Sequence, residues 1–566
     1  GAPSFTRDIL RSLVLLLGPS GTSPIHEFTA FELLFASVGR SPSLKIQRSL
    51  DNQKECKIAE FTSLFDIFDF TRLGDGSFKE SVEKILQCTR DCFPSEWRVI
   101  ISAICPTGDL LFASVSLDAS KTLSTNVTCI VSQDTKALTS DDIYDSIVLP
   151  IDRLVHRSES QLNGLDEHKA KENFSSDAAK REWWAQRNEI DRQMQEIIED
   201  TETNFFSDHV KQLFCGETVE DSQPVSFNLA SKFEEVAMET TAQHETEQSE
   251  LEQRDELRKK TVPILKEKLL DLGFTKKEAR GMRKADLINA IVAKSSGNRP
   301  SPKHKNPVAN HSHRNQHILL LLDENLQRFP FEAFSFLRGK AVSRIPSLQF
   351  ALVHLRQQKT KNSNIFVDGS KTSFVVDPES NLQNTAKTIL PLFQELAEKN
   401  GWDWSGVVGK QPTEEFVEDA VSSNGGLFLY CGHGGGSLPT SRAKIESLAG
   451  RSPLKSVIIL MGCSSGKLSS INRKGLATEQ RVPIVFDPEG IALTYLCGGA
   501  PSVVGNLWDV TDRDIDRYCK MLLENFMGKR GMTLPQCVAE ARQSCKLKFI
   551  VGLAPVCYGI PTILKD

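Results

Sequence analysis

Short apolar runs alternate with helical stretches through the last part of the chain. The runs comprise residues 317–323, 373–377, 427–431, 456–461 and 502–508. Between them, segments such as 384–400 and 413–423 carry apolar residues at the spacing of an amphipathic helix. Strands that are apolar on both faces and alternate with helices are typical of a mostly parallel sheet covered by helices. The pattern therefore predicts an α/β domain over residues 317–566.

A different pattern fills residues 1–232 and predicts a helical and small-β region. Its extended apolar stretches, typical of a small antiparallel unit, are 97–106, 110–117 and 126–133. A long helix is predicted within 181–200, where one apolar stripe recurs at i, i+4, i+7 and i+8. The stripe consists of Ile190, Met194, Ile197 and Ile198.

Residues 233–316 differ from both neighbouring regions in charge and apolar content, which predicts an insert. Its acidic first part, 233–255, has few apolar residues, so we expect it to be flexible. Residues 261–294 predict two short helices in a basic stretch, and 295–316 has the composition of a linker. The helical pair resembles the SAP motif, a module that often contacts DNA, and a solvated helical hairpin is the alternative. The bases that would meet phosphates are Lys276, Lys277, Arg280, Arg283 and Lys284.

The overall composition argues against several classes of protein. A net charge of −5 and a pI near 6.2 do not fit a uniformly basic nucleic-acid binder. No apolar run approaches the roughly 18 residues that cross a bilayer, so we expect no membrane partner. The 13 cysteines form no facing Cys-x-x-Cys pairs, which argues against a structural zinc site and favours reduced thiols.

Two of the apolar runs end in glycine-rich segments, and each presents one reactive side chain. "LFLYCGHGGG" presents His433, and "SVIILMGCSSGK" presents Cys463. Ligands of open α/β sheets bind beyond the carboxyl ends of the strands, and neighbouring strands lie about 4.8 Å apart. If these strands are neighbours, the imidazole is placed to activate the thiol. The pattern predicts a thiol active site, with the alternative that Cys463 fills the core and His433 caps a turn.

The same segments offer backbone N–H groups to an oxyanion. The expected donors are the amides of Gly434 and Cys463, and one such donor is worth roughly 3 kcal/mol in acyl transfer. Thiol acyl transfer needs neither a metal nor an organic cofactor, so we expect none.

The two glycine-rich segments form part of a wider set of motifs. "WWAQRNEID" lies at 183–191, "GNLWDVTDRDID" at 505–516 and "LKFIVGLAPVCYGIP" at 547–561. Together with "YCGHGGG" and "LMGCSSG", these segments resemble separase, a caspase-like cysteine endopeptidase. The resemblance implies a caspase-like α/β fold, with Cys463 as the nucleophile and His433 as the general base and acid.

The resemblance also implies a substrate, a partner and a location. It implies cleavage of the kleisin subunit of cohesin after an arginine, in a Glu-x-x-Arg context, which starts sister chromatid separation at anaphase. It further implies restraint by securin, a pseudosubstrate inhibitor, and action in the cytoplasm and the nucleus.

An arginine before the cut requires a carboxylate, because the guanidinium stays charged at any relevant pH. By family position, Asp516 is the first candidate and Asp512 the second, with Trp508 lining the pocket and Asp509 close by. Asp509 and Asp512 fit equally well as N-caps of the following helix.

Two further expectations concern the substrate. Bases that would meet the glutamate three residues before the cut are Lys467, Arg473 and Lys474. "DELR", which ends at Arg258 in the insert, approximates Glu-x-x-Arg and predicts self-cleavage there.

Two other functions remain open at this point. A different caspase-fold peptidase, such as a CHAT-like one, shares similar His, Cys and Trp-Asp boxes but lacks the segments at 183–191 and 547–561. A non-catalytic scaffold, tethered to chromatin by the basic insert, would keep the fold without the chemistry. Covalent labelling by an arginine-terminated acyloxymethyl ketone separates a peptidase from a scaffold.

Overall fold

The computed structural model describes parts of the N-terminal region and most of the predicted α/β domain. The described residues are 46–47, 77–104, 110–117, 123–130, 144–163, 176–215, 317–357, 365–423, 425–434, 440–468 and 488–565. The chain divides into two compact units, and all described residues belong to the unit formed by residues 1–223 and 314–566. The predicted insert at 233–316, with its helical pair, lies outside the described residues.

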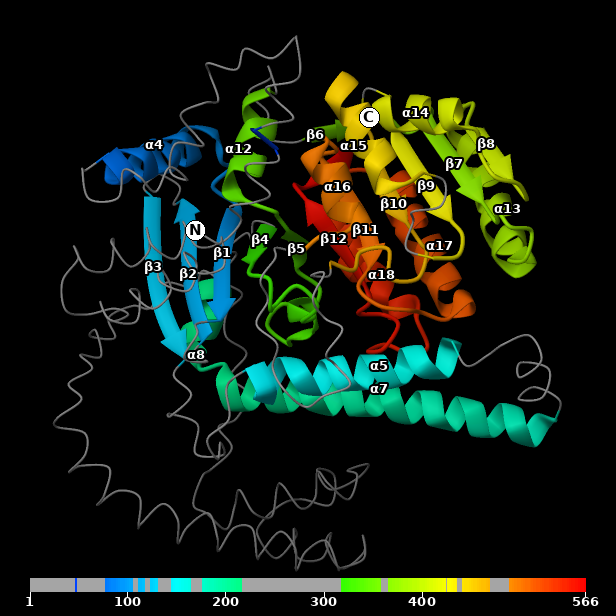
Figure 1. Ribbon diagram of the computed structural model, residues 1–566, viewed down its shortest axis with the longest axis horizontal. Helices are drawn as coiled ribbons and strands as arrows, with labels where there is room; N and C mark the ends of the chain where they lie inside the picture. Colours follow the sequence, from blue (N-terminus) through cyan, green and yellow to red (C-terminus); the bar gives the residue numbers. More distant parts are fainter. Residues whose placement is uncertain are drawn as a thin grey trace, which may run out of the picture. The chain divides into compact units, whose positions relative to one another are not determined.

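An 11-stranded sheet forms the centre of this unit (Figure 1). Its strand order is β3-β2-β1-β4-β5-β12-β11-β10-β9-β7-β8. The strands are β1 (Trp97–Ile104), β2 (Leu110–Leu117), β3 (Leu123–Ile130), β4 (His317–Leu322), β5 (Ala341–Arg344), β7 (Thr372–Val376), β8 (Ser405–Val408), β9 (Leu427–Cys431), β10 (Val457–Leu460), β11 (Ser502–Asn506) and β12 (Pro555–Gly559). The short strands β6 (Ile365–Val367) and β13 (Thr562–Leu564) pair with each other.

Most neighbouring strands of the sheet run parallel. Seven of its ten described pairings are parallel, and the antiparallel pairs are β1 with β2, β2 with β3 and β11 with β12. The apolar runs predicted as strands coincide with β4, β7, β9, β10 and β11. The predicted mostly parallel α/β fold is confirmed.

The N-terminal strands belong to the same sheet as the α/β domain. β1 pairs in parallel with β4, so that Trp97 lies opposite His317 and Ser102 opposite Leu322. β2 and β3 continue from β1 as an antiparallel unit. The helical and small-β region thus extends the central sheet. The domain boundary predicted at residue 232 stays a prediction.

Helices flank the sheet (Figure 1). The α-helices among the described residues are α4 (Ser77–Cys92), α5 (Leu149–Asn163), α7 (Asp177–Phe205), α8 (Asp208–Cys215), α12 (Leu348–Gln357), α13 (Gln383–Asn400), α14 (Glu414–Ser422), α15 (Arg442–Arg451), α16 (Ile491–Cys497), α17 (Asp512–Gly528) and α18 (Leu534–Ala541). α17 packs between α13 and α18, and the long helix α7 lies beside α5 (Figure 1).

Packing against the core fixes helix α7. Within the predicted apolar stripe, Ile190, Met194 and Ile198 are buried and Ile197 is partly buried. The helix begins at a cap, because the Ser176 side chain accepts a hydrogen bond from the N–H of Ala179 (3.1 Å). Shortening one of the buried side chains to alanine would cost roughly 2–5 kcal/mol, more than the roughly 0.7 kcal/mol that separates ordinary residues in helix propensity.

Candidate active site

Strands β9 and β10 lie next to each other and run in the same direction. Their register pairs Tyr430 with Leu460, an offset of 30 residues. His433 and Cys463 are separated by the same offset, and each lies three residues beyond that pair. The sheet therefore presents the two residues at equivalent positions of one rim.

The segments that carry these residues touch beyond the strands. The N–H of Met461 donates to the carbonyl of Tyr430 (2.8 Å), which prolongs the pairing. A Cβ atom on Gly462 would collide with the carbonyl oxygen of Gly434, so this close approach of the two backbones requires glycine. The Tyr430 hydroxyl donates to the carbonyl of His433 (2.9 Å) and closes the turn. Backbone contact thus joins the His433 segment to the Cys463 segment.

The turn after Cys463 is held by the end of β11. Ser464 adopts a left-handed backbone conformation with a φ of 54°, which is uncommon for a residue other than glycine. Its N–H donates to the carbonyl of Trp508 (3.2 Å). The hydroxyl of Ser465 accepts from the N–H of Asn506 (3.1 Å) and donates to the last carbonyl of β10 (2.8 Å). These bonds fix the backbone immediately after the thiol.

The Cys463 thiol is half-buried and donates a hydrogen bond to the carbonyl of Val510 (3.5 Å). Burial raises the pKa of the thiol to about 11, and the carboxylates of Asp509 and Asp512 add to the rise. The thiol is therefore protonated at neutral pH. A base has to remove its proton before the sulfur can act as a nucleophile.

His433 is the histidine of the same rim, and it is half-buried. Partial burial raises the pKa of the Asp512 carboxyl, and the nearby His433 imidazole lowers that pKa in part. The Asp512 carboxylate in turn helps to raise the pKa of the Cys463 thiol. The three side chains form one electrostatic group, in which the imidazole is the base available to the thiol.

Asp516 is the buried member among the aspartates predicted to recognise arginine. Its Oδ2 accepts a hydrogen bond from the Thr385 hydroxyl (3.0 Å). Burial raises the pKa of this carboxyl to about 7, although the bond from Thr385 works against the rise. A guanidinium brought to this carboxyl would favour its ionised form through charge-assisted hydrogen bonds.

Asp509 and Asp512 have different roles in the backbone around the site. Asp509 accepts a hydrogen bond from the Ser464 hydroxyl (2.5 Å), so it belongs to the turn after Cys463. Helix α17 begins at Asp512 with Thr511 at its N-cap position. Neither aspartate is therefore the N-cap, which was the alternative for both.

Trp508 is fully buried, and its indole N–H donates to the carbonyl of Ile550 (2.6 Å). The ring belongs to the core beneath the rim, and direct contact with a substrate stays a prediction. The same holds for the amides of Gly434 and Cys463 as oxyanion donors, which lie in the two segments that meet at Gly462.

Lys467, one of the bases predicted to meet an acidic substrate residue, pairs with Glu159 of α5 (3.6 Å). Glu159 also pairs with Arg328 (3.6 Å). A carboxylate of the N-terminal region thus reaches the segment that follows Cys463. The predicted site residues outside the described ranges are Arg258, Arg473 and Lys474, together with the five bases of the insert.

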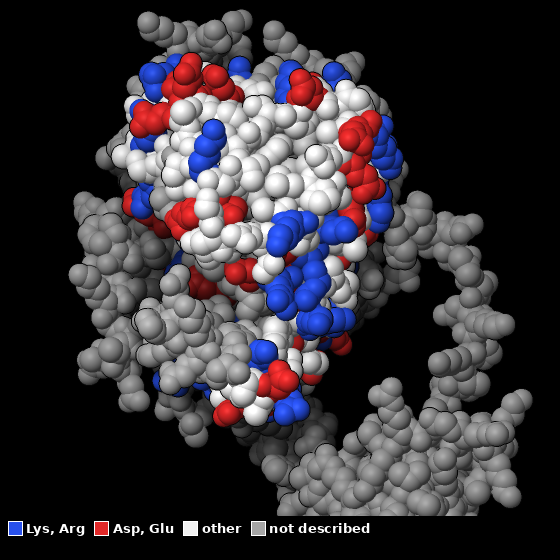
Figure 2. All heavy atoms as spheres, turned by 90° about the vertical axis from the view of Figure 1, so that its right-hand side faces the viewer, with Lys and Arg blue, Asp and Glu red and all other residues white. Residues whose placement is uncertain are grey.

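Basic side chains gather beside the first turns of α17. Arg513, Arg517 and Lys520 follow one face of the helix, and Lys546 and Lys548 are exposed on a turn that binds α17 through its backbone. On the face displayed in Figure 2, Lys and Arg side chains form one dense group, whereas acidic and basic side chains are mixed elsewhere. Such a group attracts anionic segments of a partner.

Some residues that hold the site were not found from the sequence. Ser464, Ser465 and Asn506 make hydrogen bonds around Cys463. The small polar residues directly after the cysteine were the signal available for the two serines, and Asn506 left none. Glu159 leaves no such signal, because its partners Lys467 and Arg328 lie far away in the sequence.

Three findings bear on other chemistry. No helix in the described part of the chain is both long and apolar enough to span a membrane. Within the same ranges, no group of three or more His, Cys, Asp or Glu side chains is placed to hold a metal ion. The ten cysteines whose side chains the structure describes form no disulfide.

Residues 151–515, more than half of the chain, match the family model of the separin protease domain. The chain belongs to the separin protease-domain family. The matched range includes the His433 and Cys463 segments as well as helix α7.

Separins of animals and fungi share the sequence over a similar length. The separin of Mus musculus is 34% identical over 256 residues, which cover 44% of this chain and 11% of the mouse protein. The separin of Saccharomyces cerevisiae is 30% identical over 261 residues, which cover 43% of this chain and 14% of the yeast protein. The chain thus spans a small part of the length of these separins.

The fold of the chain is similar to that of a solved separase. A crystal structure of the Saccharomyces cerevisiae separase-securin complex matches with a TM-score of 0.57 and 20% identity, covering 99% of this chain and 38% of that chain. The separase-type α/β fold that the sequence motifs imply is confirmed.

Proposed function

We propose that this separin protease domain is a cysteine endopeptidase, with Cys463 as the nucleophile and His433 as the general base and acid. The observation that carries the proposal is the backbone contact at Gly462 between two segments that leave neighbouring parallel strands in register. Such a rim allows one substrate carbonyl to meet both side chains. Family and fold favour the same chemistry.

The proposed reaction begins with proton transfer, because burial keeps the Cys463 thiol protonated at neutral pH. His433 takes the thiol proton as the sulfur attacks the carbonyl carbon, which forms a C–S bond and an oxyanion. The amides of Gly434 and Cys463 are the proposed oxyanion donors. The C–N bond then breaks while the imidazolium protonates the leaving amine. Water, deprotonated by the same imidazole, hydrolyses the thioester and restores the thiol.

The proposed specificity is for an arginine before the cut. Asp516 would receive the guanidinium, and the more exposed Asp512 would be a second carboxylate. A buried carboxyl with a pKa near 7 gains most from a cation, since the pairing removes the cost of its burial. Trp508 would support this pocket from the core, and Asp509 would support it through the bond with Ser464.

In the cell, we propose cleavage of the kleisin subunit of cohesin in a Glu-x-x-Arg context, in the cytoplasm and nucleus. Family membership supports this assignment. Securin is the proposed inhibitor, because a yeast separase of the same fold was crystallised in a separase-securin complex. Contact of the basic insert with DNA is a further proposal that rests on sequence alone.

Covalent labelling tests the chemistry. An arginine-terminated acyloxymethyl ketone should label the folded chain at Cys463, and the Cys463→Ser variant should take up no label. Asp516→Asn should still contain the thiol but label slowly. A folded wild-type chain that resists the ketone would favour the non-catalytic scaffold.

Peptide cleavage tests the specificity. A kleisin peptide varied through every residue before the cut should be cleaved best with arginine. A preference for any uncharged residue at that position would reject Asp516 as the arginine partner while leaving the thiol chemistry intact.

Self-cleavage after Arg258 is proposed as well. The active chain and the Cys463→Ser variant should differ in a denaturing gel, with two fragments of the active chain meeting at residue 258. Identical band patterns would end this proposal.

A further inference from the structure

One aspartate of the long helix α7 reaches a turn near the end of the chain. The Oδ1 atom of Asp191 accepts hydrogen bonds from the N–H groups of Phe549 (2.8 Å) and Ile550 (2.7 Å). Two bonds from consecutive amides to one carboxyl oxygen set both the position and the orientation of the turn. A residue of the N-terminal region thus holds part of the α/β domain by its backbone.

The same turn is held from its other side by α17. The carboxylate of Asp514 accepts from the N–H groups of Lys546 (2.9 Å) and Leu547 (3.1 Å). The guanidinium of Arg187 is buried one helical turn before Asp191. It interacts electrostatically with the carboxyl groups of Asp191 and Asp514. The turn is therefore clamped between two helices, and α7 supplies one of the two carboxylates.

From this turn, a chain of hydrogen bonds leads to the thiol. The carbonyl of Ile550 accepts from the indole N–H of Trp508 (2.6 Å), and the carbonyl of Trp508 accepts from the N–H of Ser464 (3.2 Å). Ser464 follows Cys463 directly. The thiol itself donates to Val510, two residues after Trp508 (3.5 Å). A shift of the turn would thus be passed to both sides of the sulfur.

We propose that Asp191 is a positioning residue for the Cys463 thiol. It acts through the backbone of Phe549 and Ile550 and then through Trp508, without contact to the substrate. This inference rests on the proposed thiol peptidase function. It assigns to α7, which lies outside the catalytic rim, a part in the geometry of the reaction.

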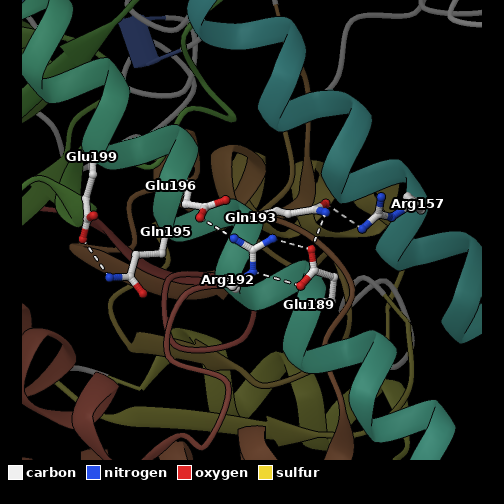
Figure 3. A network of polar contacts seen from close by, with 7 residues as sticks. All are labelled: Arg157, Glu189, Arg192, Gln193, Gln195, Glu196 and Glu199. Carbon is white, nitrogen blue, oxygen red and sulfur yellow. Dashed lines mark hydrogen bonds and ion pairs between the residues drawn. The ribbon is translucent and has the colours of Figure 1, made fainter. Parts of the chain in front are cut away.

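The outward face of α7 provides the contrast. There, Arg192 bonds to Glu189 and Glu196, and Gln193 bonds to Glu189 and to Arg157 of α5 (Figure 3). These charged groups are exposed or half-exposed, and exposed ion pairs contribute little to stability. Glu189 and Glu196 thus belong to a surface network, whereas Asp191 of the same helix belongs to the clamp on the turn.

Substitutions in the full chain separate positioning from folding. Asp191→Leu keeps the approximate size of the side chain and removes the acceptor, and Asp191→Asn keeps one acceptor oxygen. We expect the rate of labelling by the arginyl acyloxymethyl ketone to fall at least tenfold in Asp191→Leu and by about threefold or less in Asp191→Asn. Glu196→Gln, which changes only the surface network, should label at the wild-type rate.

A second reagent distinguishes a positioning role of Asp191 from a merely structural one. Iodoacetamide alkylates a thiol without being positioned by the protein, so its rate with Asp191→Leu should stay within about threefold of the wild type. Met194→Ala is the stability control, because it removes a buried side chain of the same helix and leaves the Asp191 carboxyl in place. At equal distance below each melting temperature, Met194→Ala should label at close to the wild-type rate.

The outcomes distinguish the two proposals. A wild-type chain that the ketone does not label rejects the peptidase itself. A labelled wild type whose Asp191→Leu variant reacts as fast as Met194→Ala rejects the positioning role alone. A parallel fall of the ketone and iodoacetamide rates in Asp191→Leu also overturns it, because such a fall would reflect general loss of the fold.

Discussion

Two parts of the same sheet end in different ways. Beyond β4, the chain enters a segment whose aromatic side chains are buried, among them Phe329, Phe331 and Phe334. Their rings contact one another and Phe206 in edge-on or tilted arrangements, with the ring centroids of Phe206 and Phe334 4.5 Å apart. Beyond β9 and β10, the chain enters glycine-rich turns that carry His433.

The difference lies in what fills the space beyond each strand. Aromatic side chains fill it after β4, and this arrangement stabilises the fold through buried apolar area. Backbone fills it after β9 and β10, because glycines such as Gly462 allow the chains to touch. Polar side chains then reach the surface of the rim. A strand end becomes a candidate site when backbone packing replaces side-chain packing there.

The largest effect is expected when the buried carboxylate of Asp516 is removed. Asp516→Asn should lower kcat/KM for an arginine substrate by roughly 10²–10³-fold, because a buried cation without its anion costs about 3–5 kcal/mol. Steady-state kinetics with a kleisin peptide measures the loss. Asp512→Asn is the matched control, and its smaller effect should follow from its exposure. Equal losses in both variants would contradict the assignment.

Removing an aromatic side chain should lower the stability of the fold and leave the chemistry of the thiol unchanged. Phe331→Ala should lower the free energy of unfolding by roughly 3–5 kcal/mol, since the ring is fully buried. Denaturant unfolding measures this change. The rate of Cys463 labelling in the folded variant should be unaltered, because the aromatic cluster follows β4, which three strands of the sheet separate from β10. A large fall in that rate would show that the two parts of the sheet are coupled.

Titration of Asp516 should make the stability of the folded chain depend on pH. Its folded pKa of about 7 lies above the ordinary value of 3.8, so the folded chain keeps a proton that the unfolded chain loses between these values. This group therefore makes stability fall as pH rises from about 4 through 7. We expect Asp516→Asn to gain roughly 2–4 kcal/mol relative to the wild type between pH 4 and pH 8. Unfolding midpoints that shift equally in both proteins would contradict this.

The smallest effect is expected at Glu159. Its carboxylate adds to the rise in the pKa of Cys463, so Glu159→Gln should increase alkylation by iodoacetamide about two- to threefold at pH 8. Asp152→Asn is the control, because Asp152 pairs with the same Arg328 (3.2 Å) without acting on the thiol. An equal increase in both variants would trace the effect to loosening of α5.

The strands that form the rim were predictable from the sequence, whereas some of their neighbours were not. Five nearly continuous apolar runs marked β4, β7, β9, β10 and β11. β5 and β12 were missed: β5 has four residues including a buried arginine, Arg344, and β12 begins with a proline, Pro555. Arg344 is tolerated there because Glu332 pairs with it in the core (2.7 Å), a partner that no local pattern reveals.

The candidate site shows the same limit. His433 and Cys463 were found because each ends an apolar run at glycines, which is a local signal. Asp191 was not found, because its partners are backbone amides more than 350 residues away, and amides leave no trace in residue type. Sequence patterns thus indicated the reacting groups, and the contacts that would orient them required the folded chain.

The most direct test of the central claim measures whether His433 acts on Cys463. The rate of labelling by the arginyl ketone should be followed from pH 5 to pH 10 in the wild type and in His433→Gln. The wild type should label well below the thiol pKa, because the imidazole removes the thiol proton. The variant should label slowly and keep rising toward the thiol pKa of about 11. Identical profiles in the two proteins would contradict the account.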